Sequence, residues 1–599
     1  MNRLLTTASL ALFGLIAMQS SAFAFENTIT DTDPTKDEIV LDFDDDLSDA
    51  EIKAFSKGLG LDVHLNSIYA DDPNIYIADI KEGDFPKWNA LLKKKAPAGW
   101  LDSAEENVEY QAFGIPNDPL YKYQWNFKQV NAEQAWPHST GKNVVVAVID
   151  TGVALEDKAS KNIKAVKDLA GTGRVPGYDF VDNDAFPWDG HGHGTHVAGT
   201  IAQTTNNKYG VAGLANGAKI MPLRVLNSRG FGQVADIANA IRFAADNGAQ
   251  VINMSLGGPL PSFVMKRAIK YAHSKGVTVV AAAGNGGKRS PSYPAAYDHT
   301  IAVAATQFDK KTTFYSQWGS FVDIAAPGGN TRVDQNGDGR PDGIMQQTLK
   351  SAGQTDKHDF LLYMGTSMAA PHVAAAAALV IEQGVTHPDK VEAILLKSAS
   401  DEMSKKYSNK REYKERYGSG LMQADAAAKS AALVPGGMRL GFAALLAGLL
   451  MVRVRRKDAF LIVSKGQSAT VLGLAGFFSA GLFFLPFLGD FGALQPIVGF
   501  LSKPFAEWDQ GIFGLGFSQS AILGSALIPI AAAAFLGSKA RYVVAGVAFG
   551  FAGFLFAETF WITSDVTFIP SMGGVLDHVW LAANGLIATT VGYLALKRR

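Results

Sequence analysis

Apolar residues follow different patterns in successive parts of the 599-residue chain. Residues 116–432 alternate short Val, Ile and Ala runs, such as VVVAVID and VTVVAAAG, with helix-like segments such as VADIANAIRFAADNG. Continuous apolar strands separated by helices are typical of a parallel sheet that is covered on both faces. We therefore predict an α/β fold with a mainly parallel, doubly wound sheet. Ligand sites in such folds lie at the carboxyl ends of the strands.

The chain before this sheet is charged and less regular. Residues 25–115 combine β-like runs such as DEIVLDF and NIYIADI with charged stretches such as KEGDFPKWNALLKKKAP, which predicts a small α+β domain. Residues 1–24 contain Arg3, an apolar run and the small-x-small sequence Ala22-Phe23-Ala24. These are the features of a signal peptide, so we predict that the protein is exported.

Residues 433–599 contain long apolar stretches. A bilayer requires about 20 apolar residues per helix, and the candidate spans are residues 438–452, 469–489, 512–537, 541–562 and 577–596. Basic clusters flank alternate ends, so five spans with the N-terminal domains outside satisfy the positive-inside rule. We predict a helical membrane domain of about five spans and a multi-pass protein of the inner membrane. Its larger domains would face the periplasmic or extracellular side.

Two features of this region stand apart from the spans. Glu558 is an ionisable residue near the end of one span, which by default is a functional candidate, although it is also placed to reach the interface. Pro435-Gly436-Gly437, with the following apolar run and basic cluster, resembles a glycine-glycine C-terminal sorting signal. Such signals end chains and this chain continues, so the sequence leaves processing at Gly436 and Gly437 open.

Three residues have the chemistry of nucleophilic catalysis. Asp150 ends a strongly apolar strand, His193 lies in the glycine-rich turn DGHGHGTH, and Ser367 precedes a helix predicted over residues 368–383, with Pro371 in or beside its first turn. A nucleophilic serine needs a base and an acid that orients the base. Each residue considered alone has another interpretation. Ser367 would be a helix-capping residue and Asp150 a turn or cap residue. The alternative for His193 is a metal cluster with His191 and His196.

The blocks Asp-Thr-Gly, His-Gly-Thr-His and Gly-Thr-Ser-Met-Ala-Ala-Pro-His, in this order, resemble the signature of the subtilisin family of serine endopeptidases. The resemblance implies that Asp150 orients the base, His193 acts as general base and then acid, and Ser367 attacks the peptide carbonyl. It further implies that Asn285 stabilises the oxyanion with the Ser367 amide. The residues expected to pair with the substrate backbone are Ser255, Leu256, Gly257 and Gly258.

The resemblance and the apolar C-terminal stretches together set the expected partners. Protein or peptide substrates, the membrane, and residues 25–115 as an intramolecular inhibitory propeptide are expected, and no nucleic acid. Cleavage around residues 109–116 would release the propeptide. The absence of cysteine excludes thiol catalysis, disulfides and Cys-ligated zinc. The alternative is a non-catalytic binding or membrane-complex subunit that retains the subtilisin fold.

The segment VDQNGDGRPDGI has the spacing of a calcium loop. Its oxygen donors are Asp334, Asn336, Asp338 and Asp342 in the pattern D-x-N-x-D-G-x-x-D. Carboxylates gathered in one turn repel one another unless a cation neutralises them. We predict structural calcium here, with a solvated acidic turn as the alternative. The segment from Thr204 to Gly210 resembles a second calcium loop of the family.

Overall fold

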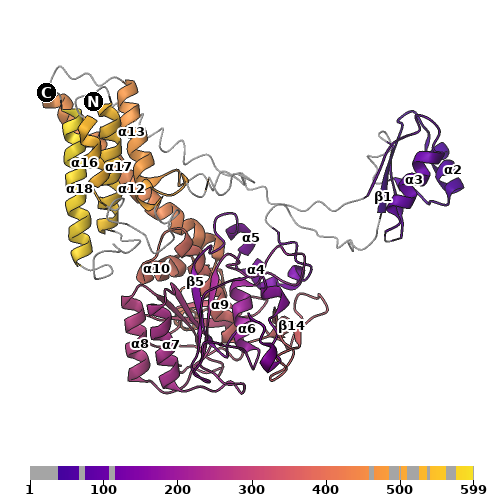
Figure 1. The fold of residues 1–599 in the computed structure, drawn as a ribbon. Coiled ribbons are helices and arrows are strands. Elements are labelled where there is room, and N and C mark those ends of the chain that lie inside the picture. Colours follow the sequence, from indigo (N-terminus) through magenta and orange to yellow (C-terminus); the bar gives the residue numbers. More distant parts are fainter. Residues whose placement is uncertain are drawn as a thin grey trace. The chain divides into compact units, whose positions relative to one another are not determined.

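The computed structural model (Figure 1) describes residues 38–65, 74–81, 83–106, 115–457, 465–483, 498, 501–508, 525–535, 540–560 and 575–597. The predicted signal peptide, residues 1–24, lies outside them, as do residues 109–114 of the expected cleavage region. The chain divides into two compact units, Met1–Phe113 and Gly114–Arg599.

The N-terminal unit has an α+β architecture. Its four-stranded antiparallel sheet has the order β2-β3-β1-β4. The elements are β1 (Glu38–Phe43), α2 (Asp49–Leu59), β2 (His64–Leu65), β3 (Ile75–Asp79), α3 (Phe85–Lys95) and β4 (Leu101–Glu106). Phe43, Tyr76 and Leu92 are fully buried in its core. The runs DEIVLDF and NIYIADI thus supply β1 and β3, and the propeptide role of this unit stays a prediction.

The second unit contains the predicted parallel sheet. Its strand order is β12-β11-β10-β9-β5-β8-β6, with β7 also paired to β8. The strands are β5 (Val145–Asp150), β6 (Gly173–Arg174), β7 (Tyr178–Asp179), β8 (Lys219–Arg224), β9 (Val251–Met254), β10 (Thr278–Ala282), β11 (Ile301–Thr306) and β12 (Ile324–Pro327). All neighbouring pairs are parallel. Both faces of the central strands are buried, which explains their unbroken apolar sequences.

Helices cover both faces of this sheet. On one face, α7 (Val234–Asp246) and α8 (Phe263–Ser274) enclose a core that includes Met221, Ile252 and Ile269. On the other face, α6 (His193–Ala202) and the alanine-rich α9 (Thr366–Glu382) share a second core with β5, β10 and β11. The α/β prediction with a doubly wound parallel sheet is confirmed.

Shorter elements complete this α/β domain. The helices are η1 (Tyr121–Tyr123), α4 (Trp125–Gln129), α5 (Ala132–Ala135), η2 (Ala159–Lys161), η3 (Lys167–Leu169), α10 (Pro388–Ser398), η4 (Glu402–Lys406) and α11 (Lys410–Tyr417). The strands β13 (Ile344–Leu349) and β14 (His358–Tyr363) form an antiparallel hairpin. The predicted calcium loop, residues 334–342, immediately precedes this hairpin.

The C-terminal region is helical. Its elements are α12 (Ala424–Lys457), α13 (Lys465–Ala480), η7 (Phe505–Glu507), α16 (Leu527–Ala532), η9 (Ala533–Phe535), α17 (Arg541–Phe560) and α18 (Val575–Leu596). Helix α17 packs against α12, α13 and α18. A Cβ at Gly550 would lie 2.4 Å from the Phe478 side chain, and one at Gly553 would lie 2.5 Å from Ala443. Glycine at these positions therefore lets the helices approach closely.

Three of the described helices are long and apolar enough to cross a membrane: Ala424–Val452 within α12, α17 and α18. The prediction of five spans is therefore supported in part. Helix α13 has 16 residues and covers only part of the expected span 469–489, and residues 512–524 lie outside the described residues. The span expected at 438–452 belongs to α12, which begins at Ala424 and continues through the boundary predicted between residues 432 and 433.

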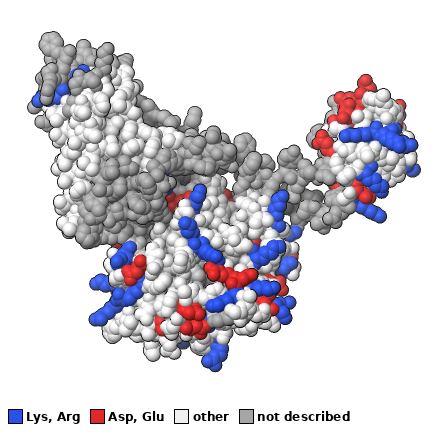
Figure 2. Space-filling model, in the orientation of Figure 1, with Lys and Arg blue, Asp and Glu red and all other residues white. Residues whose placement is uncertain are grey.

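Surface charge differs between the α/β domain and the C-terminal helices. On the face shown in Figure 2, Lys, Arg, Asp and Glu side chains are spread over the α/β domain, whereas the described C-terminal helices are almost free of them. An apolar helix surface is what a lipid environment requires, because it leaves no charged group to be desolvated.

Candidate active site

A buried acid and a histidine form the centre of the candidate site. Asp150 is the last residue of β5 and is fully buried, and His193 is the first residue of α6, with a side chain 20% exposed. His193 Nδ1 lies 2.7 Å from Asp150 Oδ1, which also accepts the Thr151 N–H at 2.7 Å. Burial opposes the charged imidazole, but the Asp150 carboxylate outweighs burial and raises the pKa of His193.

A close approach of two segments holds this pair together. A Cβ added at Gly194 would lie 2.2 Å from the Gly152 carbonyl oxygen and 3.1 Å from Asp150 Cβ. Any larger residue at position 194 would push α6 away from the end of β5. The glycine in the His-Gly-Thr-His block is therefore explained by packing.

Asp189 is a site residue that the sequence analysis missed. Its Oδ1 accepts the N–H groups of His191 and Gly192, each at 2.8 Å, and the Thr151 hydroxyl at 2.9 Å. Its Oδ2 accepts the Thr195 N–H at 3.0 Å. Asp189 thus caps the start of α6, and its charge also contributes to the raised pKa of His193. Asp189 lies three residues before Gly192, which occupies the N-cap position of α6, so the usual spacing of a cap residue gave no signal for it.

Ser367 lies in the first turn of α9, which begins two residues earlier than predicted. Pro371 is inside the helix and not in its first turn, which corrects the sequence-based expectation. Proline cannot donate to the carbonyl four residues earlier, that of Ser367. The Ser255 hydroxyl donates to this carbonyl instead, at 2.7 Å.

The Ser367 hydroxyl donates to the Ser255 carbonyl at 3.1 Å, and among the described residues it makes no hydrogen bond to His193. Catalytic hydrogen bonds are often formed only when substrate is bound. Ser255 follows β9, and β9 is the sheet neighbour of β5, which carries Asp150. The serine, the histidine and the acid therefore lie at the carboxyl edge of two adjacent strands.

Two N–H donors lie beside Gly365. The Asn285 Oδ1 accepts the Thr366 N–H at 2.9 Å and the Thr366 hydroxyl at 2.8 Å, which fixes the orientation of the side-chain amide. A Cβ added at Gly365 would lie 3.4 Å from Asn285 Nδ2 and 3.6 Å from the Ser367 backbone nitrogen. Both donors thus border one small space, the arrangement that a developing oxyanion requires.

A cleft of about 440 Å³ opens beside Ser367. It is lined by the four predicted substrate-binding residues, Ser255 to Gly258, and by Asn285. Gly258 pairs with Tyr293 through two backbone hydrogen bonds of 2.8 Å. Extended backbone that lines a cleft suits a peptide bound by strand addition.

The remaining histidines of the signature blocks have structural contacts. His196 is buried and stacks on Tyr363 with ring centroids 4.3 Å apart, and burial lowers its pKa to about 3. His372 contacts the Met368 carbonyl at 2.8 Å and Asn126 at 2.9 Å, and burial lowers its pKa to about 4. Neither belongs to the metal-type cluster found among the described residues.

The predicted calcium loop is closed by its own side chains. Asp334 accepts the N–H groups of Gly337 and Gly339 at 2.8 and 3.0 Å, and Asp338 accepts that of Arg340 at 2.9 Å. Asn336 donates to Asp338 at 2.8 Å. Asp342 is buried, and its Oδ1 has no hydrogen-bond partner among the described residues. Burial, with the neighbouring Asp334 and Asp338 carboxylates, raises the pKa of Asp342.

The segment from Thr204 to Gly210 meets two buried carboxylates that the sequence analysis did not identify. Asp118 accepts the Asn206 N–H at 2.8 Å, and Asp168 accepts the Asn207 side-chain amide at 2.8 Å. Burial raises the pKa of Asp168 to about 6, and the negative charge of Asp118 adds to the rise. Two buried acids facing one loop have the chemistry of a cation site.

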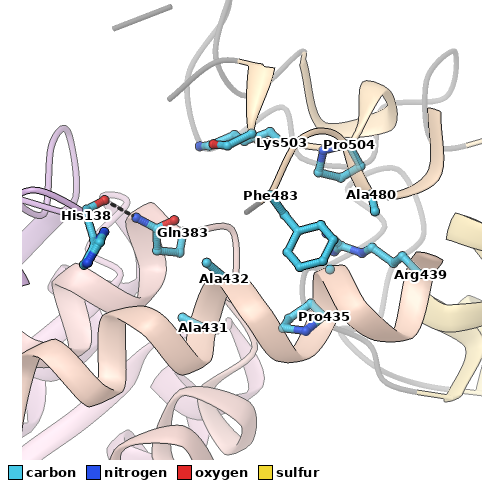
Figure 3. Close-up of a pocket in the computed structure, with 12 residues that line it drawn as sticks. His138, Gln383, Ala431, Ala432, Pro435, Arg439, Ala480, Phe483, Lys503 and Pro504 are labelled. Carbon is cyan, nitrogen blue, oxygen red and sulfur yellow. Dashed lines mark hydrogen bonds between the residues drawn. The ribbon is translucent and has the colours of Figure 1, made fainter. Parts of the chain in front are cut away.

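A second feature lies between the α/β domain and the C-terminal helices of the same unit. Figure 3 shows a small pocket bordered by Pro435 and Arg439 of α12, Phe483 and Lys503. Lys503 Nζ donates to the Glu382 carbonyl at the end of α9 at 3.1 Å. A Cβ at Gly436 would lie 2.5 Å from the Phe483 ring, so glycine is required for this packing.

Comparisons with known proteins identify the class to which this fold and site belong. Residues 141–420 match the subtilase family. The chain is 42% identical over 270 residues to thermitase of Thermoactinomyces vulgaris, which covers 45% of this chain and 86% of thermitase. It therefore belongs to the subtilase family and is a subtilisin-like serine endopeptidase.

A second curated relative agrees with this assignment. Subtilisin Savinase of Lederbergia lenta is 37% identical over 306 residues, which covers 51% of this chain and 98% of that protein. Among solved structures, a protease of Pseudoalteromonas arctica matches with a TM-score of 0.47 and 33% identity over 53% of this chain and 99% of that chain.

Proposed function

We propose that this protein hydrolyses peptide bonds through Asp150, His193 and Ser367. The hydrogen bond of 2.7 Å between His193 Nδ1 and the buried Asp150 carboxylate carries the proposal. It holds the imidazole in the tautomer whose Nε2 accepts a proton. Ser367 Oγ then attacks the peptide carbonyl carbon while its proton passes to His193.

The remaining steps use the same groups. Asn285 Nδ2 and the Ser367 N–H donate to the oxyanion, and His193 returns its proton to the leaving amine as the acyl-enzyme forms. Water then attacks the acyl carbon while His193 takes its proton, and His193 returns that proton to Ser367 Oγ as the acid product leaves. The substrate backbone pairs with residues 255–258 along the cleft.

Labelling with a fluorophosphonate tests the nucleophile. The mature chain, without residues 25–115, is expected to be labelled in detergent, and the same chain with Ser367→Ala is expected to lose both the label and peptide cleavage. Ser419→Ala, a change at an exposed serine elsewhere in the domain, serves as the matched control. Equal labelling of all three chains would contradict the assignment. A folded wild-type chain without label would favour the alternative of a non-catalytic subunit.

The setting of the enzyme is also part of the proposal. Residues 1–24 direct export, residues 25–115 inhibit the peptidase until they are cleaved, and the C-terminal helices of residues 433–599 tether the peptidase domain, residues 116–432, outside the inner membrane. Protease protection in right-side-out spheroplasts is the test. Cleavage of the peptidase domain by added protease is expected, and its protection there would overturn this topology.

Structural calcium completes the proposed function. Asp342 Oδ1 is buried and has no hydrogen-bond partner in the described part of the chain, which fits a cation bound with Asp334, Asn336 and Asp338. The buried pair Asp118 and Asp168 fits a second cation. Calcium would neutralise these acids. Chelation is expected to lower the thermal midpoint of the chain, and less so in Asp342→Asn. An unchanged midpoint on chelation would contradict bound calcium.

A further inference from the structure

Two histidines and an aspartate form a cluster that the proteolytic mechanism does not use. His273 lies in the last turn of α8, His299 in the turn before β11, and Asp389 in the first turn of α10. One potential ligand atom of each residue lies within 4.8 Å of the other two. Three elements distant in sequence thus bring two ring nitrogens and a carboxylate oxygen together.

The contacts within the cluster are close. His273 Nε2 lies 2.7 Å from Asp389 Oδ1, and the ring centroids of His273 and His299 are 3.9 Å apart. His299 has a backbone φ of 64°, the left-handed region that few residues other than glycine adopt. The fold therefore holds this histidine in an uncommon backbone conformation beside the other two side chains.

The cluster lies at the edge of the sheet opposite to the candidate active site. His273 shortly precedes β10 and His299 shortly precedes β11, whereas Asn285 follows β10. At about 3.3 Å per residue, the strand separates the two edges by roughly 16 Å. A ligand at the cluster would not contact Ser367 or the bound peptide.

We propose that His273, His299 and Asp389 bind a zinc ion. Imidazole and carboxylate are ligands that zinc prefers, at about 2.0–2.2 Å. Ligand atoms of a tetrahedral site at that distance are about 3.4 Å apart, so rotations of these side chains bring the three atoms into place. Three protein ligands leave the fourth position to water.

Two observations favour a metal: the cluster is accessible to solvent, and a further ring nitrogen near it, that of His387, is not used in a hydrogen bond among the described residues. The side chains of His273 and Asp389 are 18% and 58% exposed, so an ion reaches them from solvent. His387, at the start of α10, has a buried Nδ1 without a hydrogen-bond partner among the described residues. The competing explanation is a surface hydrogen bond between His273 and Asp389 with no ion.

Zinc titration of the untagged full chain in detergent tests the site. The Ser367→Ala background prevents self-cleavage, and excess calcium in the buffer fills hard-cation sites. We expect one zinc ion per chain by calorimetry, and cobalt bound in its place to give the visible absorption of a tetrahedral site. His273→Ala and Asp389→Asn are each expected to weaken zinc binding at least tenfold. His358→Ala, which changes a partly buried histidine on β14, is expected to bind as the background does.

Two results would overturn the proposal. One is the absence of stoichiometric zinc binding by the background chain. The other is equal zinc affinity of the background, His273→Ala and Asp389→Asn, which would place the ion elsewhere, such as on His193 and Asp150. Circular dichroism checks the fold of each variant. Asp389→Asn keeps the shape and a hydrogen bond to His273, so its loss of zinc would not reflect a packing defect.

Discussion

The peptidase domain and the C-terminal helices each bury a carboxylate beside a basic partner, and they do so differently. Asp150 faces an imidazole, and its Oδ2 has no hydrogen-bond partner among the described residues. Glu558 of α17 faces Arg439 of α12, whose Nη2 and Nε lie 2.8 and 3.1 Å from one carboxylate oxygen. The side chains of Arg439 and Glu558 are only 6% and 1% exposed.

The two basic partners differ in whether they exchange a proton near neutral pH. Imidazole gains and loses a proton near neutral pH, so the first pair can take part in acid–base chemistry. Guanidinium keeps its charge at all relevant pH values, so Arg439 exchanges no proton, and its contact with Glu558 joins α12 to α17. Under the proposed mechanism, the buried carboxylate at a strand end takes part in the reaction, whereas the one between helices holds the helices together.

The largest expected effect is that of Asp150→Asn. The amide keeps the shape but favours the wrong histidine tautomer, so kcat is expected to fall about 10⁴-fold. Peptide hydrolysis measures the loss, and the thermal midpoint is expected to change little. Asp359→Asn, at an exposed carboxylate on β14, is the control. A loss of less than tenfold would remove Asp150 from the catalytic machinery.

Glu558→Ala is expected to have the opposite effect, a loss of stability with activity retained. It leaves the Arg439 charge buried, which costs about 3–5 kcal/mol of folding free energy. The thermal midpoint in detergent is expected to fall, and peptide hydrolysis by the folded fraction is expected to stay. Replacing the pair with Arg439→Met and Glu558→Leu is expected to restore much of the stability, because no isolated charge remains. An unchanged midpoint in Glu558→Ala would refute a structural role of the pair.

Asn285→Ala tests the oxyanion donors. Loss of one donor is expected to lower kcat about 10²–10³-fold with little change in KM, because the hydrogen bond strengthens only in the transition state. Steady-state kinetics with a peptide substrate separates the two constants. Asn247→Ala, at the end of α7, is a control far from the cleft. An increase confined to KM would indicate a role in substrate binding.

The smallest expected effect is a shift in pH dependence. The pKa of His193 is raised from 6.5, so the base is neutral, and kcat/KM reaches its plateau, only above that value. Asp189→Asn removes one of the charges that raise this pKa, which moves the acid limb to lower pH. The profile of kcat/KM against pH measures the shift. If the acid limb of the profile stays at the same pH, the role of Asp189 would be limited to its hydrogen bonds at the start of α6.

Local sequence patterns predicted the sheet and the candidate triad, because their signals are short. The apolar run before Asp150 and the glycine-rich turn at His193 each occupy fewer than about a dozen residues, within the range of periodicity and turn chemistry. The residues that orient the site side chains, in contrast, lie far from them in the sequence. Thr366 orients Asn285 across 81 positions, and Ser255 bonds to Ser367 across 112. No local pattern encodes such partners.

The C-terminal helices illustrate the same limit. Their apolar composition indicated where helices lie, but lipid-facing and buried positions are equally apolar, so the sequence did not predict which helices pair. Arg439 and Glu558 are separated by 119 positions, and only the tertiary structure brings them together. Helix α12 also begins earlier than its apolar stretch, because its first turns are buried against the peptidase core at Ala424, Ala427 and Ala428.

The proline inside α9 has a mechanical consequence. By leaving the Ser367 carbonyl without its usual helical donor, Pro371 makes room for the Ser255 hydroxyl. The first residue of the segment that would grip the substrate is thereby tied to the backbone of the nucleophile. In the proposed mechanism, a substrate that pairs with residues 255–258 would therefore lie along a segment that is hydrogen-bonded to the backbone of the attacking residue.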